Sequence, residues 1–180
     1  MYCGSNKTAR SSQDRIACAL IALMEQRPFS AISVSELSRA AGVSRQTFYS
    51  LFGTKEDVIS YVLRESYGYS MDAAELPGCD SALERMCRGY SGYIASQRQF
   101  LRLLVENNIS YLLYDSIAGS LLECGCFLGA RPPRERQYAA NFTAGGIAGI
   151  VREYVMEEGE GDALDQIFLE LFSGSIYDEP

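Results

Sequence analysis

Apolar residues recur every three or four positions along most of the chain, which is the spacing of helices that bury one face. Ile16, Leu20 and Leu23 form such a stripe and predict a first helix, which Pro28 stops. No segment alternates apolar and polar residues for long enough to indicate a β-sheet. The sequence therefore predicts an all-α protein.

The same spacing predicts further helices through the rest of the chain. We expect a long helix at residues 54–75 that ends at Leu76-Pro77-Gly78. Asp80 is expected to cap the next helix, which continues to Ile94. The remaining helices are expected at residues 100–105, 107–128, 134–157 and 162–172.

Residues 33–58 contain three helix starts and a tight turn. Ser33 and Glu36 have the spacing of a capping box, so the first of these helices should begin near residue 34. Gly42 can take the left-handed backbone conformation that ends this helix, and Ser44 is a good N-cap for the next. Two short helices joined by such a turn indicate a helix-turn-helix. The apolar face of the first helix is expected to hold Val34, Leu37, Ala40 and Ala41.

The second helix of this motif has a polar outer face. Phe48, Leu51 and Phe52 fall on its inner side. The outward side chains are types that contact DNA, because Arg and Gln pair with guanine and adenine edges and Tyr reaches phosphates. Thr54 and Asp57 open a third helix, whose free amides and adjacent lysine would suit a phosphate. The candidate DNA-binding residues are Ser33, Ser44, Arg45, Gln46, Thr47, Tyr49 and Lys55.

Residues 29–59, with the amphipathic helix before them, resemble the N-terminal domain of the TetR/AcrR family of bacterial transcriptional regulators. The resemblance implies a three-helix helix-turn-helix DNA-binding domain at residues 1–54. It also implies a larger helical effector-binding and dimerisation domain at residues 55–180. Gln46 stands where this family often has glycine, and Ser50-Leu51 stand where a Tyr-His-type pair is frequent. Both departures lie on the recognition helix, so they affect the expected operator sequence and not the fold.

By this resemblance, the protein is expected to be a ligand-responsive repressor that binds a palindromic double-stranded DNA operator as a homodimer. An activator of the same fold and an effector-binding module with a non-functional DNA head are the alternatives. The small-molecule effector is unknown, and no cofactor or metal is expected. An enzyme is not expected, because the chain has no histidine, glycine-rich phosphate loop or nucleophile elbow.

The net charge of −7 is divided unevenly along the chain. Residues 1–60 hold seven Lys and Arg against five Asp and Glu, a net charge of +2, and the remaining residues carry −9. The basic end is therefore the expected DNA-binding end. No apolar run approaches the ~18 residues of a membrane span, and no secretory leader is evident, so we expect a cytoplasmic protein without membrane contact.

The six cysteines do not have the spacing of a metal site. Cys124 and Cys126 form one C-x-C pair, and no histidine is available to complete a zinc centre. Most of the cysteines are expected to be small buried apolar residues. A thiol sensor that uses Cys87, Cys124 or Cys126 is the alternative.

Small residues gather on the helix expected at residues 134–157. Glycine within a helix costs ~0.5–1 kcal/mol relative to alanine, so several glycines predict a compensating close contact with another helix. The family resemblance places this contact between two subunits, as does a likeness of residues 142–155 to the C-terminal domain of regulators near dihydroxyacetone kinase operons. Tight packing within one subunit is the alternative. The small residues are Ala139, Ala140, Ala144, Gly145, Gly146, Ala148 and Gly149.

The central helices are rich in tyrosine. Aromatic residues at helical spacing usually belong to a core, but buried hydroxyls need partners and can mark a cavity with a few polar contacts. By resemblance, this region is expected to hold the effector cavity. The candidate lining residues are Tyr90, Tyr93, Tyr111 and Tyr114.

Overall fold

The computed structural model describes residues 7–72, 81–124, 127–157 and 164–173. These residues form nine α-helices and one short 3-10 helix and contain no strand, which confirms the all-α prediction. The helices are α1 (Lys7–Met24), η1 (Phe29–Ala31), α2 (Val34–Ala40), α3 (Arg45–Leu51), α4 (Lys55–Asp72), α5 (Ala82–Ser96), α6 (Arg98–Glu106), α7 (Tyr111–Glu123), α8 (Pro133–Met156) and α9 (Leu164–Ser173).

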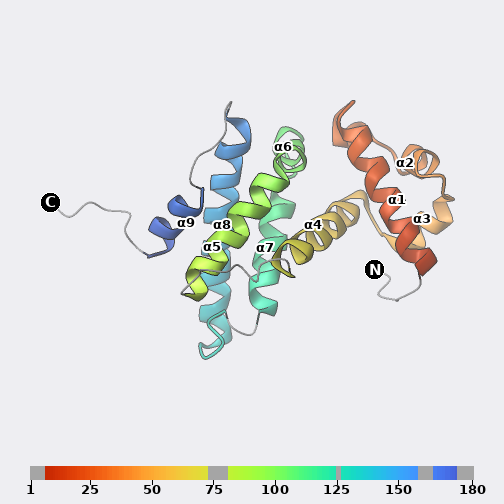
Figure 1. Ribbon diagram of the computed structural model, residues 1–180. Helices are drawn as coiled ribbons and strands as arrows, with labels where there is room; N and C mark the ends of the chain where they lie inside the picture. Colours follow the sequence, from red (N-terminus) through yellow and green to blue (C-terminus); the bar gives the residue numbers. More distant parts are fainter. Residues whose placement is uncertain (1–6, 73–80, 125–126, 158–163, 174–180) are drawn as a thin grey trace.

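The helices form two groups joined by α4 (Figure 1). We call α1, η1, α2 and α3 the head, and α5 to α9 the body. In the body, α8 packs mainly against α7, and α9 packs against α5. Helix α4 contacts α1 at its beginning and α5 and α7 further along, so it is shared between the head and the body.

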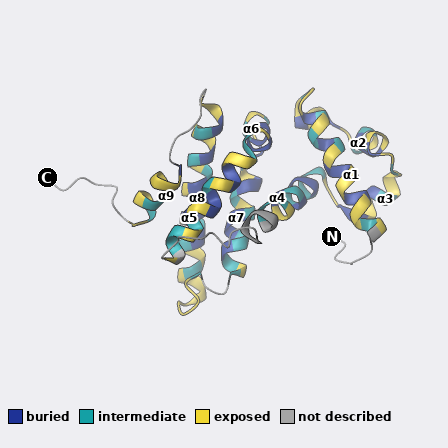
Figure 2. Ribbon diagram, in the orientation of Figure 1, coloured by how far each residue is buried: buried dark blue, intermediate teal, exposed yellow. Residues whose placement is uncertain are grey.

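The apolar stripe of α1 packs against the helix-turn-helix. Ile16 and Leu20 are fully buried, together with Leu37 of α2 and Phe48 of α3. The predicted apolar faces of the three helices are confirmed at these positions. Figure 2 shows the resulting pattern, in which each head helix is buried on one side and exposed on the other.

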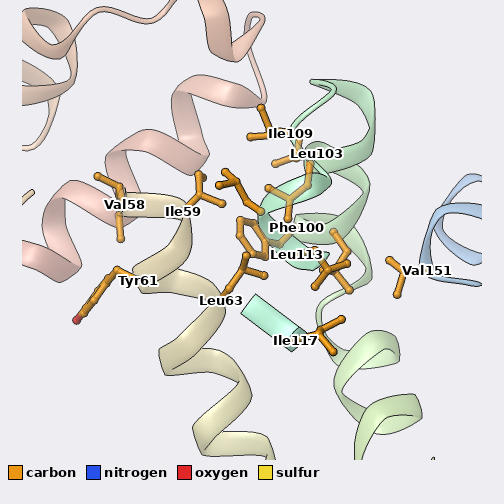
Figure 3. Close-up of a cluster of buried hydrophobic side chains, with 14 of the residues drawn as sticks. Val58, Ile59, Tyr61, Leu63, Phe100, Leu103, Ile109, Leu113, Ile117 and Val151 are labelled. Carbon is orange, nitrogen blue, oxygen red and sulfur yellow. The ribbon is translucent and has the colours of Figure 1, made fainter. Parts of the chain in front are cut away.

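Helix α4 continues this core into the body. Val58 and Ile59 are fully buried near the start of the helix, and Leu63 is buried one turn later. Figure 3 shows these residues in one cluster with side chains of α6 and α7. The cluster also includes Phe100, Leu103, Ile109, Leu113, Ile117 and Val151.

Several helix boundaries differ from the prediction. Ser81, and not Asp80, is the N-cap of α5; its hydroxyl accepts from the amide of Glu84 in a complete capping box. Asp80 itself, like the predicted Leu76-Pro77-Gly78 stop, lies outside the described residues. Helix α7 begins at Tyr111 and not at residue 107, because Asn108 has a left-handed backbone with φ of 57°.

The structure contains η1, a turn of 3-10 helix that the sequence analysis did not predict. Three residues are too short to produce a periodic apolar pattern, so this element has no signature of the kind that predicted the longer helices. Among the described helices, none is both long enough and apolar enough to cross a membrane.

Candidate nucleic-acid interface and internal cavity

Helix α2 begins at Ser33, as predicted. The Ser33 hydroxyl accepts a hydrogen bond from the Glu36 amide at 3.2 Å. The Glu36 carboxylate forms an ion pair with Arg27 at 2.6 Å. The Ser33 cap is therefore confirmed, whereas the Glu36 side chain ties α2 to the segment that follows α1.

Of the four positions predicted for the inner face of α2, two are buried, one is partly buried and one is exposed. Leu37 and Ala41 are buried, and Val34 is partly buried. Ala40 is exposed, while Ser38 is buried with an unpaired hydroxyl. Ser38 lies beside Leu37 and one turn before Ala41, so these three residues share the inward side of α2 and Ala40 falls outside it.

The turn of the motif depends on Gly42, whose φ is +63°. Its amide bonds to the Arg39 carbonyl, and the Val43 amide bonds to the Ser38 carbonyl at 2.9 Å. A left-handed residue at this position satisfies carbonyls that would otherwise be left unpaired at the end of the helix. The turn prediction is confirmed.

Helix α3 is held by one face and presents the other. Phe48 and Leu51 are buried, which fixes the helix against α1 and α2. Arg45 and Gln46 are exposed and, within the described part of the chain, make no side-chain hydrogen bond or ion pair. Tyr49 is 52% exposed, with its ring edge-on to Phe48 at 5.4 Å.

Two of the candidate residues on this motif bond to each other. The Ser44 hydroxyl accepts from the Thr47 amide at 3.0 Å and lies 2.8 Å from the Thr47 hydroxyl. Ser44 is therefore the N-cap of α3, as predicted. Thr47 is partly buried, so it is less accessible to a ligand than Arg45 or Gln46.

The start of α4 is more fully occupied than the sequence analysis expected. The amides of Gly53 and Thr54 both donate to the Asp57 carboxylate at 2.9 Å. The Thr54 hydroxyl in turn accepts from the Asp57 amide, which confirms the predicted helix start. These bonds use the Asp57 amide of the first turn and the two amides just before the helix. A phosphate contact through the amides of Lys55 and Glu56 stays a prediction.

The Lys55 ammonium is also engaged within the head. It donates to the carbonyls of Phe29 at 2.7 Å and Ile32 at 2.5 Å. It also lies 4.4 Å from the centroid of the Phe29 ring, within cation–π range. Two of its three donor sites are thus used internally, and a phosphate contact through the third remains a prediction.

Three tyrosines pack together where α4 meets α5. The ring of Tyr67 stacks on Tyr90 at 5.3 Å and lies edge-on to Tyr93 at 5.5 Å. The Tyr93 hydroxyl lies 3.2 Å from the hydroxyl of Ser66, whereas the buried Tyr90 hydroxyl has no hydrogen-bond partner. Burial raises the pKa of each of the three phenols, so all three are neutral at physiological pH.

A cavity of about 10 Å³ lies beside these rings, roughly the volume that one water molecule needs. It is enclosed by apolar and hydroxyl-bearing side chains from α4, α5 and α7, and three of its apolar residues appear in Figure 3. The lining residues are Leu63, Tyr67, Tyr93, Leu113, Ser116, Ile117 and Ser120.

The structure separates the four tyrosines that were predicted to line one cavity. Tyr90 and Tyr93 are buried in the same cluster. Tyr111 is 51% exposed at the start of α7, so its assignment to an internal cavity is wrong. Tyr114 is partly buried toward α8, with a ring carbon 4.0 Å from the position that a Cβ on Gly145 would take.

Of the predicted residues, Tyr93 alone lines the cavity, and Tyr67 is a lining tyrosine that the sequence analysis did not select. Tyr67 follows Ile59 and Leu63 at intervals of four residues, so it continues the buried stripe of α4. That spacing was the available signal. It identified the inward face of the helix but could not show that three tyrosines from two helices meet there.

The cysteines have different environments. Cys87 is buried, and burial raises the pKa of its thiol, which argues against a role as a reactive thiolate. Cys18 is exposed, contrary to the expectation for most of the cysteines, and Cys124 is partly buried. Cys3, Cys79 and Cys126 lie outside the described residues. Among those described, no group of three potential ligands could hold a metal ion.

Comparisons with known proteins agree with this geometry. The profile of the family described as bacterial regulatory proteins, tetR family, matches residues 18–62, which extend from α1 through the helix-turn-helix into α4. Over these residues the chain therefore resembles TetR-family regulators. Its fold is also similar to that of Lin0861 from Listeria innocua, with a TM-score of 0.78 and 19% identity over 97% of this chain and 94% of that one.

Two curated proteins that this chain resembles are transcriptional regulators. The regulator EthR of Mycobacterium tuberculosis is 44% identical over 61 residues, which cover 32% of this chain and 28% of EthR. The dhaKLM operon transcriptional activator DhaS of Lactococcus lactis is 33% identical over 100 residues, 56% of this chain and 46% of DhaS. The matched regions thus span less than half of either relative.

Proposed function

We propose that this protein is a DNA-binding regulator, and specifically a homodimeric, ligand-responsive repressor that recognises a palindromic operator. The observation that carries the proposal is the two-sided character of α3. Its buried residues fix the helix to the head, while Arg45, Gln46 and Tyr49 face outward with no competing hydrogen bonds or ion pairs among the described residues. Such a helix can enter the major groove without rearranging.

The outward face of α8 supports the dimer. Phe142 is 82% exposed and Tyr138 is 60% exposed, although both lie on a helix whose other side is buried. Gly146 and Gly149 are exposed, and a Cβ added to either would meet nothing within 4 Å. Packing within the subunit therefore does not account for these glycines, whereas a partner helix would cover the aromatic side chains and approach closely at the glycines.

The tyrosine cluster supports an effector site within the body. The side chains around the small cavity carry hydroxyl and alkyl groups and no charge. A neutral ligand with a hydroxyl or carbonyl group would match this lining, because it could bond the hydroxyls of Tyr67, Tyr93 or the two serines without leaving a buried charge unpaired. The ligand would have to widen the cavity, and α4 is one of its walls.

Repression is the proposed direction of control, because a dimer bound across an operator blocks access to the DNA. The similarity to DhaS, which is named as an activator, makes activation the second candidate. In vitro transcription from the bound promoter separates the two. We further propose that the protein acts in the cytoplasm, where its DNA target would be found.

Selection of bound fragments from random DNA tests the proposal most directly. We expect a palindromic site whose half-sites lie about one helical turn apart, because a two-fold dimer presents two copies of α3. Recovery of a single half-site would contradict the dimer on DNA. If no sequence is enriched, the protein is an effector-binding module with a non-functional head, and the DNA-binding proposal is wrong.

A further inference from the structure

The peptide group of Phe29 is held from two sides by residues distant in the sequence. Its amide donates to Oδ1 of Asn107 at 2.6 Å, across 78 positions of the chain. Its carbonyl accepts from Nζ of Lys55 at 2.7 Å. Asn107 follows α6 in the body, and Lys55 begins α4, so the head segment around Phe29 is bonded to both.

The Phe29 amide needs this external partner. Phe29 is the first residue of η1, so its amide has no acceptor within the helix, and Pro28 at the N-cap supplies none from its side chain. The Phe29 side chain is buried, so loss of the Asn107 oxygen would leave the amide poorly paired. Asn107 thus acts as a helix cap supplied by the body to the head.

The Asn107 side chain is itself fixed. Its Nδ2 donates to the Leu103 carbonyl at 2.8 Å, which leaves Oδ1 directed toward Phe29. The chain then turns at Asn108 and enters the core at Ile109, whose amide bonds to the Leu104 carbonyl at 2.9 Å. Movement of the end of α6 must therefore move the oxygen that holds Phe29.

On the head side, the same peptide leads directly to the DNA-binding motif. Lys55 bonds to Ile32 as well as to Phe29, and Ile32 immediately precedes Ser33, the N-cap of α2. Lys55 also follows the short connection from α3 to α4. The Lys55 ammonium therefore connects the segment just before α2 with the segment just after α3, and it is also bonded to the Phe29 carbonyl.

We propose that Asn107 is a positioning residue that sets the orientation of the head relative to the body. A shift of α6 is transmitted through Asn107 to the Phe29 peptide, and from there through Lys55 to both ends of the helix-turn-helix. This inference rests on the proposed function only for its effect on DNA. The contact between Gln99 and Glu25 also joins head and body, but it is exposed and 3.3 Å long, so it should set the orientation only weakly.

Three variants of the full chain test the role. Asn107→Ala removes the acceptor, Asn107→Asp keeps an acceptor for Phe29 but loses the bond to Leu103, and Gln99→Ala is the control for loss of a head–body hydrogen bond. Hydrogen exchange should accelerate at the Phe29 amide by about tenfold or more in Asn107→Ala, and much less in the other two variants.

Residual dipolar couplings measure the orientation without DNA. We expect one alignment tensor to fit head and body in the wild-type protein, in Asn107→Asp and in Gln99→Ala, but not in Asn107→Ala. If Asn107→Ala does not fold, Asn107→Gln replaces it; its longer side chain should rotate the head relative to its wild-type orientation. Unchanged couplings in the folded variant, or unchanged Phe29 exchange, would overturn the proposal.

Selection on random DNA then gives the functional readout. Asn107→Ala should keep the base preference of each half-site but accept half-sites at more spacings than the wild-type protein, whereas a purely structural role would weaken binding equally at all spacings. Equal weakening would overturn the positioning role on DNA. If the wild-type protein selects no DNA, the proposed function fails, and the couplings alone still decide whether Asn107 orients the head.

Discussion

The Tyr61 hydroxyl donates a hydrogen bond to Oδ1 of Asp14 at 2.6 Å, which joins α4 to α1. Arg10 and Glu65 form an ion pair at 2.5 Å between the same two helices. Arg10 lies one turn before Asp14 on α1, and Glu65 lies one turn after Tyr61 on α4. The first half of α4 is therefore bonded to the head as well as packed against it. The predicted division of the chain between residues 54 and 55 stays a prediction, but these contacts suggest that any bending occurs further along α4.

We expect the free energy of unfolding to fall steeply above about pH 10. Burial, followed by the bond to Asp14, raises the pKa of Tyr61 above its ordinary value, and burial does the same for Tyr90. The folded state therefore favours the protonated phenols. Their stabilisation is complete below the unfolded pKa near 10 and is lost as the pH rises toward the folded values. Chemical denaturation between pH 7 and pH 11 measures this loss.

The matched variants are Tyr61→Phe and Tyr111→Phe. Tyr61→Phe should lower the free energy of unfolding at pH 7, because it removes the hydrogen bond to Asp14. The same variant should lose less of this free energy than the wild-type protein when the pH is raised to 11. Tyr111→Phe should leave both unchanged, since Tyr111 is exposed. If the free energy of unfolding falls equally with pH in Tyr61→Phe and in the wild-type protein, Tyr61 is not a source of the pH dependence.

We expect Arg45→Ala and Gln46→Ala to relax base preference at single positions of the operator. Each lost pair with a base edge should cost ~1–3 kcal/mol of discrimination. Tyr49→Phe should instead weaken binding to all sequences alike, because a hydroxyl at the edge of the groove would contact phosphate. Competition between variant operators measures both effects, and an unchanged preference in Arg45→Ala would remove that residue from base recognition.

Gly146→Leu should yield folded monomers. A Cβ at this position would meet nothing within 4 Å in the subunit, so the fold should persist. The leucine side chain would, however, clash with a partner helix that approaches closely at Gly146. Gly92→Leu is the matched control, because Gly92 is also an exposed helical glycine with open space at its Cβ. Sedimentation at micromolar concentration compares the two; dimers of Gly146→Leu that bind DNA normally would exclude this interface.

Lys55→Ala should lower stability by about 1–2 kcal/mol, because the ammonium bonds two carbonyls of the head and is only partly buried. If its third donor site also contacts a phosphate, the salt dependence of DNA binding should fall by about one unit. Thermal melts and salt titrations separate these effects. A lower melting temperature with an unchanged salt dependence would show that Lys55 has only an internal role.

Tyr93→Phe should blunt the response to an effector while the fold is retained. It removes one hydroxyl from the cavity wall and its contact with Ser66, but it keeps the packed ring. Tyr111→Ala serves as the control and should alter neither the response nor the melting temperature, since Tyr111 is not in the cavity. A normal response in Tyr93→Phe would remove its hydroxyl from the effector site.

The sequence predicted the parts of this structure that depend on local spacing. The caps at Ser33 and Ser44 and the turn at Gly42 are determined within a few residues, and all three are confirmed. The bond from Phe29 to Asn107 joins positions that have no spacing relation, so it required the structure. The hydrogen bonds from Lys55 to the carbonyls of Phe29 and Ile32 were not predicted for the same reason.

The tyrosine assignments show a second limit. Helical spacing indicates which face of one helix is apolar, but it does not say how two faces are rotated toward each other. Tyr111 was grouped with Tyr90 and Tyr93 on composition, and it lies at the surface. The cavity itself depends on where the rings of α4 and α5 meet, which is a property of packing.

The small size of the cavity in the body has a kinetic consequence. A space that holds about one water cannot admit an effector until the surrounding helices separate. Binding there would therefore wait for a spontaneous opening, and the observed association rate should level off at high ligand concentration instead of rising in proportion to it. The plateau would report the frequency with which this body opens in the absence of any ligand.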